Sequence, residues 1–387
     1  MRAILLLIAV LISYGSLYPF NFTANGQWLR EGLALLTQPD LHTGRADMVG
    51  NVLLFVPYGF VASIIGTGRP AHATAAPVLR LALGLLLALA LQLAQLWLPS
   101  RVPALIDVIA NVLGMLLGMV AAWLARRVGP IGSGQAAHMT LQRTLAPATL
   151  MLLWLSYQWF PLVPTLDLQN MINAVKPLVR APQPDFVRAL HTALAWLAFF
   201  RLWQLATTRR PSPLVLAGAA LCILGAKLVI VGASISATNL LGLGIALACL
   251  PWQQHGAALP VLIMAMLVSL FASGLAPFDV SGVPQAFHWI PFTGMLEGSM
   301  GTNLLNLIEK SYFYGALIVF MAANGARPLA ASMALAICLA AIEAAQVFMP
   351  SRVAETTDPL LALILGFVIG LLSAQGKRAP AAVRRAG

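Results

Sequence analysis

Residues 81–107 read LALGLLLALALQLAQLWLPSRVPALID, and this stretch decides the class of fold. No charged side chain occurs from Leu81 to Ser100, and Arg101 is the first. A helix needs about 20 such residues to cross a bilayer. The whole chain has a similar composition, because 60% of its 387 residues are hydrophobic and only 9% are charged. The sequence therefore predicts an all-α integral membrane protein, since helices in lipid satisfy their own backbone groups.

Apolar segments of this kind recur from one end of the chain to the other. They predict about 12 membrane-spanning helices, each of roughly 20 residues or somewhat fewer. The first follows Met1 and Arg2 without a clear cleavage site, so we expect it to be an uncleaved span. The predicted spans are residues 3–19, 48–66, 79–98, 104–125, 145–160, 188–206, 213–231, 238–252, 258–275, 301–322, 328–348 and 359–374.

Basic residues favour alternate junctions between these spans. Cytoplasmic loops carry an excess of Lys and Arg, so the pattern predicts both termini in the cytoplasm. The net charge of +11 comes from these loops, and no basic stripe interleaved with aromatic residues predicts nucleic-acid binding. The basic residues assigned to the inner side are Arg2, Arg69, Arg80, Arg126, Arg127, Arg143, Arg209, Arg210, Arg327, Lys377, Arg378, Arg384 and Arg385.

An internal repeat organises the chain. The stretch QLAQLWLPSRVPALID at 92–107 recurs as EAAQVFMPSRVAETTD at 343–358. Upstream, YPFN at 18–21 resembles APFD at 276–279, and WFPL at 159–162 lies between them. A fixed order of repeated segments predicts a modular architecture. We expect three tandem four-helix modules, at 1–135, 140–256 and 257–380, of which the middle one is degenerate because its Pro-Ser-Arg phrase is absent.

The first module places a set of polar residues at the outer ends of its predicted spans. Asp47 with Asn51, and Asp107 with Asn111, are each four residues apart and share a helix face. Below them, Gly114 and Gly118 predict a close approach of another helix. Arg101 is the natural partner of Asp107 or Asp47, and it is also suited to holding a carboxylate or a phosphate. The predicted ligand-binding residues of this module are Asp47, Asn51, Gln92, Gln95, Arg101, Asp107 and Asn111.

The third module repeats part of this set. It keeps Glu343, Gln346, Arg352 and Asp358 as predicted ligand-binding residues, but Ala362 replaces the Asn that follows the Asp. Glu343 and Asp107 are the candidates for a general acid or base. Glu343 has an alternative role as the salt-bridge partner of Arg352. Glu309 and Lys310, at membrane depth in the tenth span, are either a further functional pair or a buried ion pair.

Two explanations of the repeated polar set stay open. The groups line an outward-facing pocket, which could be one composite site formed by the first and third modules. Alternatively, they pair across helices and only fix the packing. No cluster of His, Cys, Asp or Glu has metal-ligand spacing, and no nucleotide fingerprint is present. We therefore predict no metal and no cofactor, while the sequence leaves the oligomeric state open.

The order and spacing of these residues resemble the VanZ-like family. The family pattern is an Asp before Asn-x-x-x-Phe-x-Pro-x-Gly, then Glu-x-x-Gln, an Arg and Asp-x-x-x-Asn-x-x-Gly. The first module departs from it at Gln92, where the family has Glu, and the third lacks the Asn-x-x-x-Phe-x-Pro-x-Gly segment. The matching residues are Asp47, Asn51, Phe55, Pro57, Gly59, Gln92, Gln95, Arg101, Asp107, Asn111 and Gly114, with Glu343, Gln346, Arg352 and Asp358 in the third module.

This resemblance implies a role in the bacterial cell envelope and a place in the inner membrane. The family name is associated with teicoplanin resistance, but it supplies no reaction. Three functions follow as hypotheses. The protein binds or moves an anionic envelope lipid or lipid-linked sugar, it is an intramembrane transferase or hydrolase, or it is a structural or accessory membrane protein. The expected partners are membrane lipids and a lipid-linked or phosphorylated envelope substrate.

Overall fold

A computed structural model describes residues 2–37, 45–64, 75–101, 103–128, 135–207, 210–255, 258–294 and 300–378. Within these ranges the chain is helical, and its β-pairing is limited to isolated bridges. The chain divides into two compact units, Met1–Ser133 and Gly134–Gly387, which we call unit 1 and unit 2. The prediction of an all-α fold is therefore confirmed for the described residues.

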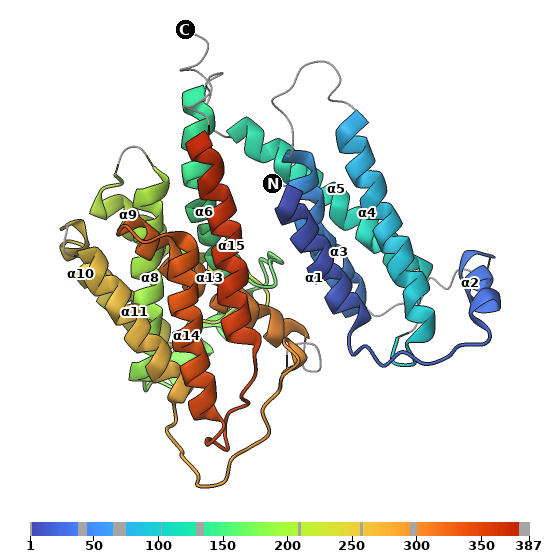
Figure 1. Cartoon of the computed structure of the whole chain (residues 1–387). Coiled ribbons are helices and arrows are strands. Elements are labelled where there is room, and N and C mark those ends of the chain that lie inside the picture. The colour runs from blue at the N-terminus through green and yellow to red at the C-terminus, as the bar shows by residue number, and fades with distance from the viewer. Residues whose placement is uncertain are drawn as a thin grey trace. The chain divides into compact units, whose positions relative to one another are not determined.

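Unit 1 is built from five described helices around a small apolar core (Figure 1). Ile12, Phe55, Tyr58, Leu91 and Met115 lie at the centre of this core, and each is at most 5% exposed. They come from four different helices, so the apolar sides of these helices meet one another. The helices are α1 (Arg2–Leu17), α2 (Trp28–Thr37), α3 (Arg45–Ile64), α4 (Ala75–Ala94) and α5 (Leu105–Val128).

Glycines bring α3 and α5 into backbone contact. A Cβ atom added at Gly114 would lie 2.2 Å from the carbonyl oxygen of Val52, and one at Gly118 would lie 2.2 Å from that of Val56. Gly59 of α3 faces Met115 of α5 in the same way, at 2.1 Å from its carbonyl oxygen. Small residues let membrane helices approach this closely. The predicted packing role of Gly114 and Gly118 is confirmed.

Unit 2 contains nine described helices, whose arrangement can be followed in Figure 1. At its centre, Trp154 of α6 stacks on Tyr312 of α13 with ring centroids 4.9 Å apart. The hydroxyl of Tyr312 donates to the carbonyl of Ala195 at 2.7 Å, which ties α13 to α8. The helices are α6 (Gln135–Gln158), α7 (Leu168–Arg180), α8 (Phe186–Ala206), α9 (Pro213–Ala226), α10 (Ala237–Cys249), α11 (Ala258–Leu275), α13 (Met300–Ala323), α14 (Pro328–Gln346) and α15 (Thr357–Arg378).

The predicted spans can be compared with these helices one by one. Each predicted span overlaps a described helix, whereas α2 and α7 lie between spans and were not predicted. Five helices of the described part are long and apolar enough to cross a membrane, and others are apolar but shorter. The chain therefore has the helices of a membrane protein, while the number of 12 crossings stays a prediction.

A turn with the same geometry follows the first helix of each predicted module. The residue after each proline has a positive φ, with values of 63°, 66° and 66° at Phe20, Leu162 and Phe278. Their amide groups donate to the carbonyls of Leu17, Trp159 and Leu275 at 2.9, 2.6 and 2.7 Å. The peptide bonds before the three prolines are cis.

A hydrogen bond from the loop after each turn also recurs. Thr23 donates to Trp97, Thr165 to Val229 and Ser281 to Phe348, at 2.9, 2.8 and 2.7 Å between amide nitrogen and carbonyl oxygen. In each case the acceptor lies two or three residues beyond the α-helix that overlaps the third predicted span of the module. These helices are α4, α9 and α14. The similarity between the first and third modules thus extends to backbone hydrogen bonds, and the middle module shares these bonds despite its different sequence.

Candidate functional site

In unit 1, the predicted polar residues lie where the C-terminal ends of α1 and α4 meet the N-terminal end of α5. Gln95 is 8% exposed and donates from Nε2 to the carbonyl of Ser16 at 2.9 Å. Gln92 is 4% exposed and accepts from the amide of Ala104 at Oε1, at 3.0 Å. These two side chains therefore join three segments of the chain at this end of the unit.

Unit 2 has the same contacts at equivalent positions. Gln346 donates from Nε2 to the carbonyl of Gly274 at 2.8 Å. Glu343 is buried and accepts from the amide of Glu355 through Oε2, also at 2.8 Å. Glu343 thus replaces Gln92 in its hydrogen-bonding role, because the atom used in both is an acceptor oxygen. The repeated spacing in the sequence corresponds to a repeated structural arrangement.

The two arginines of the repeat bind main-chain carbonyls. Arg101 donates from Nε to Tyr18 at 3.2 Å and from Nη2 to Gly15 at 3.5 Å. Arg352 donates from Nε to Ala276 at 2.8 Å and from Nη2 to Ser273 at 2.7 Å. The last carbonyls of a helix have no partner within the helix. Each guanidinium group therefore caps the end of the first helix of its predicted module.

These contacts correct two predicted pairings. Arg101 forms no ion pair with Asp107, because its guanidinium group is directed to the carbonyls at the end of α1. Arg352 forms no salt bridge with Glu343, which binds a backbone amide instead. A helix end presents several unpaired carbonyls to a fork of N–H donors. The side chain of Asp47, the other predicted partner of Arg101, lies outside the described residues.

The repeated segment of unit 2 has three carboxylates, and one of them binds a lysine. Asp358 accepts from Lys310 Nζ at 2.6 Å and from the hydroxyl of Tyr314 at 2.8 Å. Glu343 accepts from the backbone amide of Glu355, three residues before Asp358. Oε2 of Glu355 is buried and has no hydrogen-bond partner in the described part of the chain. We call Glu343, Glu355, Asp358, Lys310 and Tyr314 the acidic cluster.

The remaining predicted residues of unit 1 lie on α3 and α5. Asp107 is in the first turn of α5, and Asn111 is one turn further along and only 4% exposed. The Oδ1 atom of Asn111 accepts no hydrogen bond from any described residue. Asn51 is half-buried on α3, one turn after Asp47. The polar residues of α5 thus include a buried acceptor oxygen to which no described residue donates a hydrogen bond.

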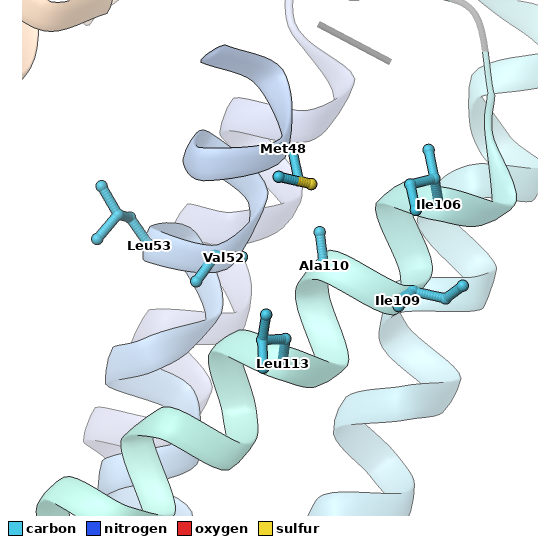
Figure 2. Close-up of a pocket in the computed structure, with 7 residues that line it drawn as sticks. All are labelled: Met48, Val52, Leu53, Ile106, Ile109, Ala110 and Leu113. Carbon is cyan, nitrogen blue, oxygen red and sulfur yellow. The ribbon is translucent and has the colours of Figure 1, made fainter. Parts of the chain in front are cut away.

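An apolar cavity opens between α3 and α5 beside these residues. Figure 2 labels the residues that line it, which are Met48, Val52 and Leu53 of α3 and four residues of α5. Its volume is about 170 Å³, and the α5 side is formed by Ile106, Ile109, Ala110 and Leu113. Ile106 and Ala110 directly precede Asp107 and Asn111. The cavity is therefore at the height of the predicted polar residues, but its lining is apolar.

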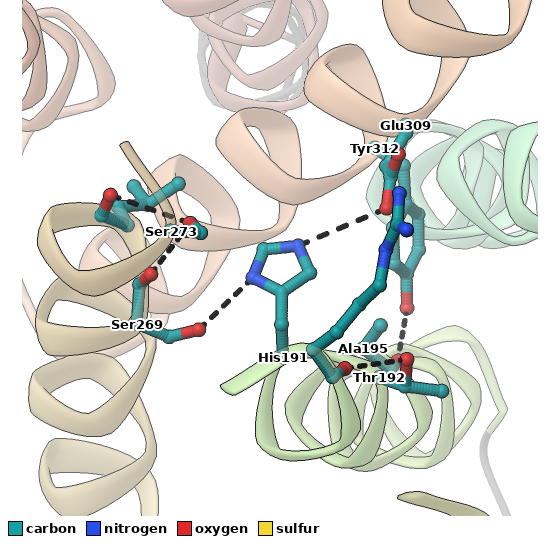
Figure 3. A network of polar contacts seen from close by, with 9 residues as sticks. His191, Thr192, Ala195, Ser269, Ser273, Glu309 and Tyr312 are labelled. Carbon is teal, nitrogen blue, oxygen red and sulfur yellow. Dashed lines mark hydrogen bonds and ion pairs between the residues drawn. The ribbon is translucent and has the colours of Figure 1, made fainter. Parts of the chain in front are cut away.

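A second polar network in unit 2 was not predicted. His191 of α8 makes a 2.9 Å hydrogen bond through Nδ1 with the hydroxyl of Ser269 on α11. Its Nε2 lies 3.9 Å from Oε1 of Glu309 on α13, as Figure 3 shows. His191 also stacks on Phe313, with ring centroids 4.3 Å apart. The network links three helices, so its contacts are those expected of side chains that hold helices together.

Glu309 and Lys310 are adjacent in sequence but have separate partners. Glu309 faces His191 of α8, whereas Lys310 faces Asp358 of α15. Neighbouring residues on a helix point about 100° apart, so they seldom share a partner. Of the two alternatives for Glu309 and Lys310, the mutual ion pair is not formed, and each residue connects α13 to a different helix. Among the described residues, no three His, Cys, Asp or Glu side chains are placed to hold a metal ion.

A protein family matches the part of the chain that contains the first set of these residues. The family model described as VanZ/LLP1 matches residues 4–126, a range that lies within unit 1. Unit 1 is a VanZ-like domain. The helix pair α3 and α5 of the VanZ-like domain, with Gly59 and Gly114 at its contact, belongs to the matched range. No curated protein and no solved structure matches the chain.

Proposed function

We propose that this protein is a multi-pass protein of the bacterial inner membrane that binds a lipid-linked sugar of the cell envelope. Both termini would lie in the cytoplasm, and the polar helix ends would face outward. The acidic cluster carries the proposal, because Glu355 there has a buried oxygen without a donor in the described residues. A buried acceptor without a partner is costly, so a ligand hydroxyl would stabilise it.

The charges of the acidic cluster favour sugar hydroxyls over a phosphate. The acidic cluster has three carboxylates and one ammonium group, that of Lys310, which already binds Asp358. Carboxylates accept hydrogen bonds and repel anions. Arg352, which could hold a phosphate, donates to carbonyls instead. Among anionic envelope lipids, we therefore favour those that carry a sugar, with the sugar rather than the phosphate at the cluster.

The VanZ-like domain offers a complementary kind of site. Asn111 supplies a buried acceptor, and the cavity of about 170 Å³, whose lining includes the preceding residue Ala110, has the apolar lining that suits a hydrocarbon chain. A pocket with a mostly apolar wall and few polar groups is typical of a site for an amphiphile. We propose that this cavity holds part of a lipid tail while Asn111 binds a hydroxyl group.

Binding to the purified protein in nanodiscs tests this function. The probe is a polyprenyl diphosphate that carries N-acetylglucosamine, and the same lipid without the sugar is the comparison. We expect the sugar-bearing lipid to bind more tightly in native mass spectrometry. Glu355→Gln and Asp358→Asn should each weaken its binding about tenfold, the effect of one charge-assisted hydrogen bond. Glu31→Gln, which changes an exposed carboxylate of α2, is the matched control. Equal binding of both lipids would refute the assignment of the sugar to the cluster.

A second candidate function is an intramembrane transferase or hydrolase acting on such a lipid. Glu343 favours it, because this carboxylate is buried among other charged groups, an arrangement common at catalytic sites. Asp107 is the equivalent candidate of the VanZ-like domain. Incubation of the protein with the sugar-bearing lipid distinguishes the two functions, since only an enzyme yields a new lipid product. Loss of that product in Glu343→Gln, with lipid binding retained, would identify Glu343 as the base.

The resemblance to the VanZ-like family also leads us to propose a link to glycopeptide resistance. Expression of the chain in a susceptible bacterium should raise the teicoplanin concentration needed to stop growth. Asn111→Ala should abolish this effect if the site in the VanZ-like domain is responsible. Unchanged growth inhibition despite normal expression would exclude the link. A purely structural role remains the third candidate, favoured by the carbonyl contacts of Arg101 and Arg352.

A further inference from the structure

The amphipathic helix α7 has an apolar stripe that the described parts of the chain do not cover. The stripe consists of Leu168, Ile172, Val175 and Val179, whose exposed fractions are 69%, 45%, 38% and 83%. Residues at this spacing lie on one side of a helix. Four large aliphatic side chains on one exposed face indicate a surface that meets an apolar environment.

The opposite side of α7 is fixed to unit 2. Asn170 donates from Nδ2 to the carbonyl of Ile230 at 3.1 Å, and its Oδ1 accepts from the amide of Gly232 at 3.2 Å. The amide of Ile235 donates to the carbonyl of Ala174 at 2.8 Å, and Ala174 is fully buried. The apolar stripe is therefore exposed although the helix is firmly attached.

Polar residues form a third side of α7, next to the apolar stripe. Asn173 accepts from Gln169 at 3.2 Å and from Lys176 at 2.7 Å, and Arg180 follows one turn later. The helix has two cations and no acidic residue between Leu168 and Arg180. An apolar side beside a basic side is the pattern of helices that lie in a membrane interface.

We propose that α7 lies flat in the membrane interface, with its apolar stripe among acyl chains and with Lys176 and Arg180 against anionic phosphate head groups. Three helices of unit 2, α11, α13 and α14, are long and apolar enough to cross a bilayer, so their ends would lie at its interfaces. A second copy of α7 is a poorer partner for the stripe, because it would bring like cations alongside. The inference does not depend on ligand binding at the acidic cluster, so either can fail without the other.

Fluorescence quenching in vesicles tests the position of α7. The full chain, with Cys222, Cys249 and Cys338 replaced by alanine, carries one fluorophore on Ile172→Cys, Val175→Cys, Val179→Cys or Asn173→Cys. Brominated lipid should quench the label at the three stripe positions several-fold more than at 173, and aqueous iodide should show the reverse. Equal iodide quenching at all positions would overturn the proposal. Protection of the stripe from both quenchers would also overturn it, since protein would then cover α7.

A second measurement tests the anionic head groups. The label at 172 is quenched by brominated phosphatidylglycerol or brominated phosphatidylcholine at the same mole fraction. We expect stronger quenching by phosphatidylglycerol, and each cation should contribute about fivefold to its local enrichment. Lys176→Gln with Arg180→Gln should make the two lipids equal, whereas the control Arg327→Gln should leave the preference intact. A preference that survives the double substitution would refute the role of these cations.

Discussion

Asp358 accepts hydrogen bonds from two side chains of one helix, Lys310 and Tyr314 of α13. Residues four apart lie on the same side of a helix, so both can reach one carboxylate on α15. Asp358 is nearly buried, whereas the side chain of Lys310 is 41% exposed. The carboxylate therefore depends on its partners more than the ammonium group does.

This arrangement predicts that Lys310 and Asp358 are energetically coupled in a double-mutant cycle. Lys310→Met removes one partner of a buried carboxylate and should destabilise the protein by about 1 kcal/mol, a value reduced for solvent exposure. Lys310→Met with Asp358→Asn should cost less than the sum of the two single substitutions. Thermal unfolding followed by size-exclusion chromatography measures these effects. Strict additivity would show that the two residues do not interact.

At Arg352, we expect the stability of the protein to depend on the shape of the side chain and not only on its charge. Arg352→Lys keeps the charge but loses the planar fork that reaches Ser273 and Ala276, so we expect a loss of about 1.5 kcal/mol in stability. Arg327→Lys, at an exposed position before α14, is the control and should have no effect. The same unfolding assay applies, and equal stability of both variants would contradict the capping role.

At the scale of single residues, the repeated spacing pointed to side chains that join segments of the chain, but not to their partners. Gln95, Arg101 and Asp358 were selected by their repeated spacing. Their partners were missed where the acceptor is a backbone carbonyl, because every residue type carries one. The His191 network has no sequence signal, since its partners Ser269 and Glu309 are distant in sequence and no local pattern joins them.

Among the elements, α3 and α5 have the tightest contact of the VanZ-like domain, and it depends on the absence of side-chain atoms. Gly118→Ala would place a Cβ 2.2 Å from the carbonyl oxygen of Val56, so we expect a loss of about 1–3 kcal/mol in stability. Gly15→Ala in α1 meets no atom within 4 Å and should be neutral or slightly stabilising. Thermal unfolding of the two variants in detergent measures the difference, and similar midpoints would contradict the backbone contact.

The helices of the chain were predictable to different degrees. Long apolar runs such as residues 79–98 marked their helices directly, because lipid requires about 20 apolar residues for a span. The helices α2 and α7 are short and mix polar with apolar residues, so no long apolar run marks them in the sequence. In α7 a signal was present, since Leu168, Ile172, Val175 and Val179 follow the period of a helix.

For the whole molecule, the division into two units differs from the expected three modules. Unit 1 coincides with the first predicted module, whereas unit 2 contains the ranges of the other two. The joint core of unit 2 explains this, because Trp154 of the middle range stacks on Tyr312 of the last. Aromatic contacts of this kind leave no repeated sequence signal. Three modules therefore stay a prediction, supported by the recurring turns at Phe20, Leu162 and Phe278.

The proposed orientation applies to the molecule as a whole and can be measured in cells. In a chain whose three native cysteines are alanine, Val283→Cys lies in an exposed loop after α11, and Ala326→Cys lies in an exposed turn before α14. The excess of cations at the inner junctions predicts that a membrane-impermeant maleimide labels only Val283→Cys in intact cells. Ala326→Cys should react after permeabilisation. The opposite pattern would invert the topology and place the polar helix ends in the cytoplasm.

The capping of α1 has a consequence for how the protein is made. The carbonyls of Ser16 and Tyr18 receive their donors from Gln95 and Arg101, which follow 79 and 83 residues later in the chain. A ribosome that has released only α1 has therefore not yet supplied those donors. Backbone groups without partners are costly in lipid, so this helix end would stay near water until α4 is inserted. If α1 is the first span, as the sequence predicts, it would reach its final depth only when the third predicted span is inserted.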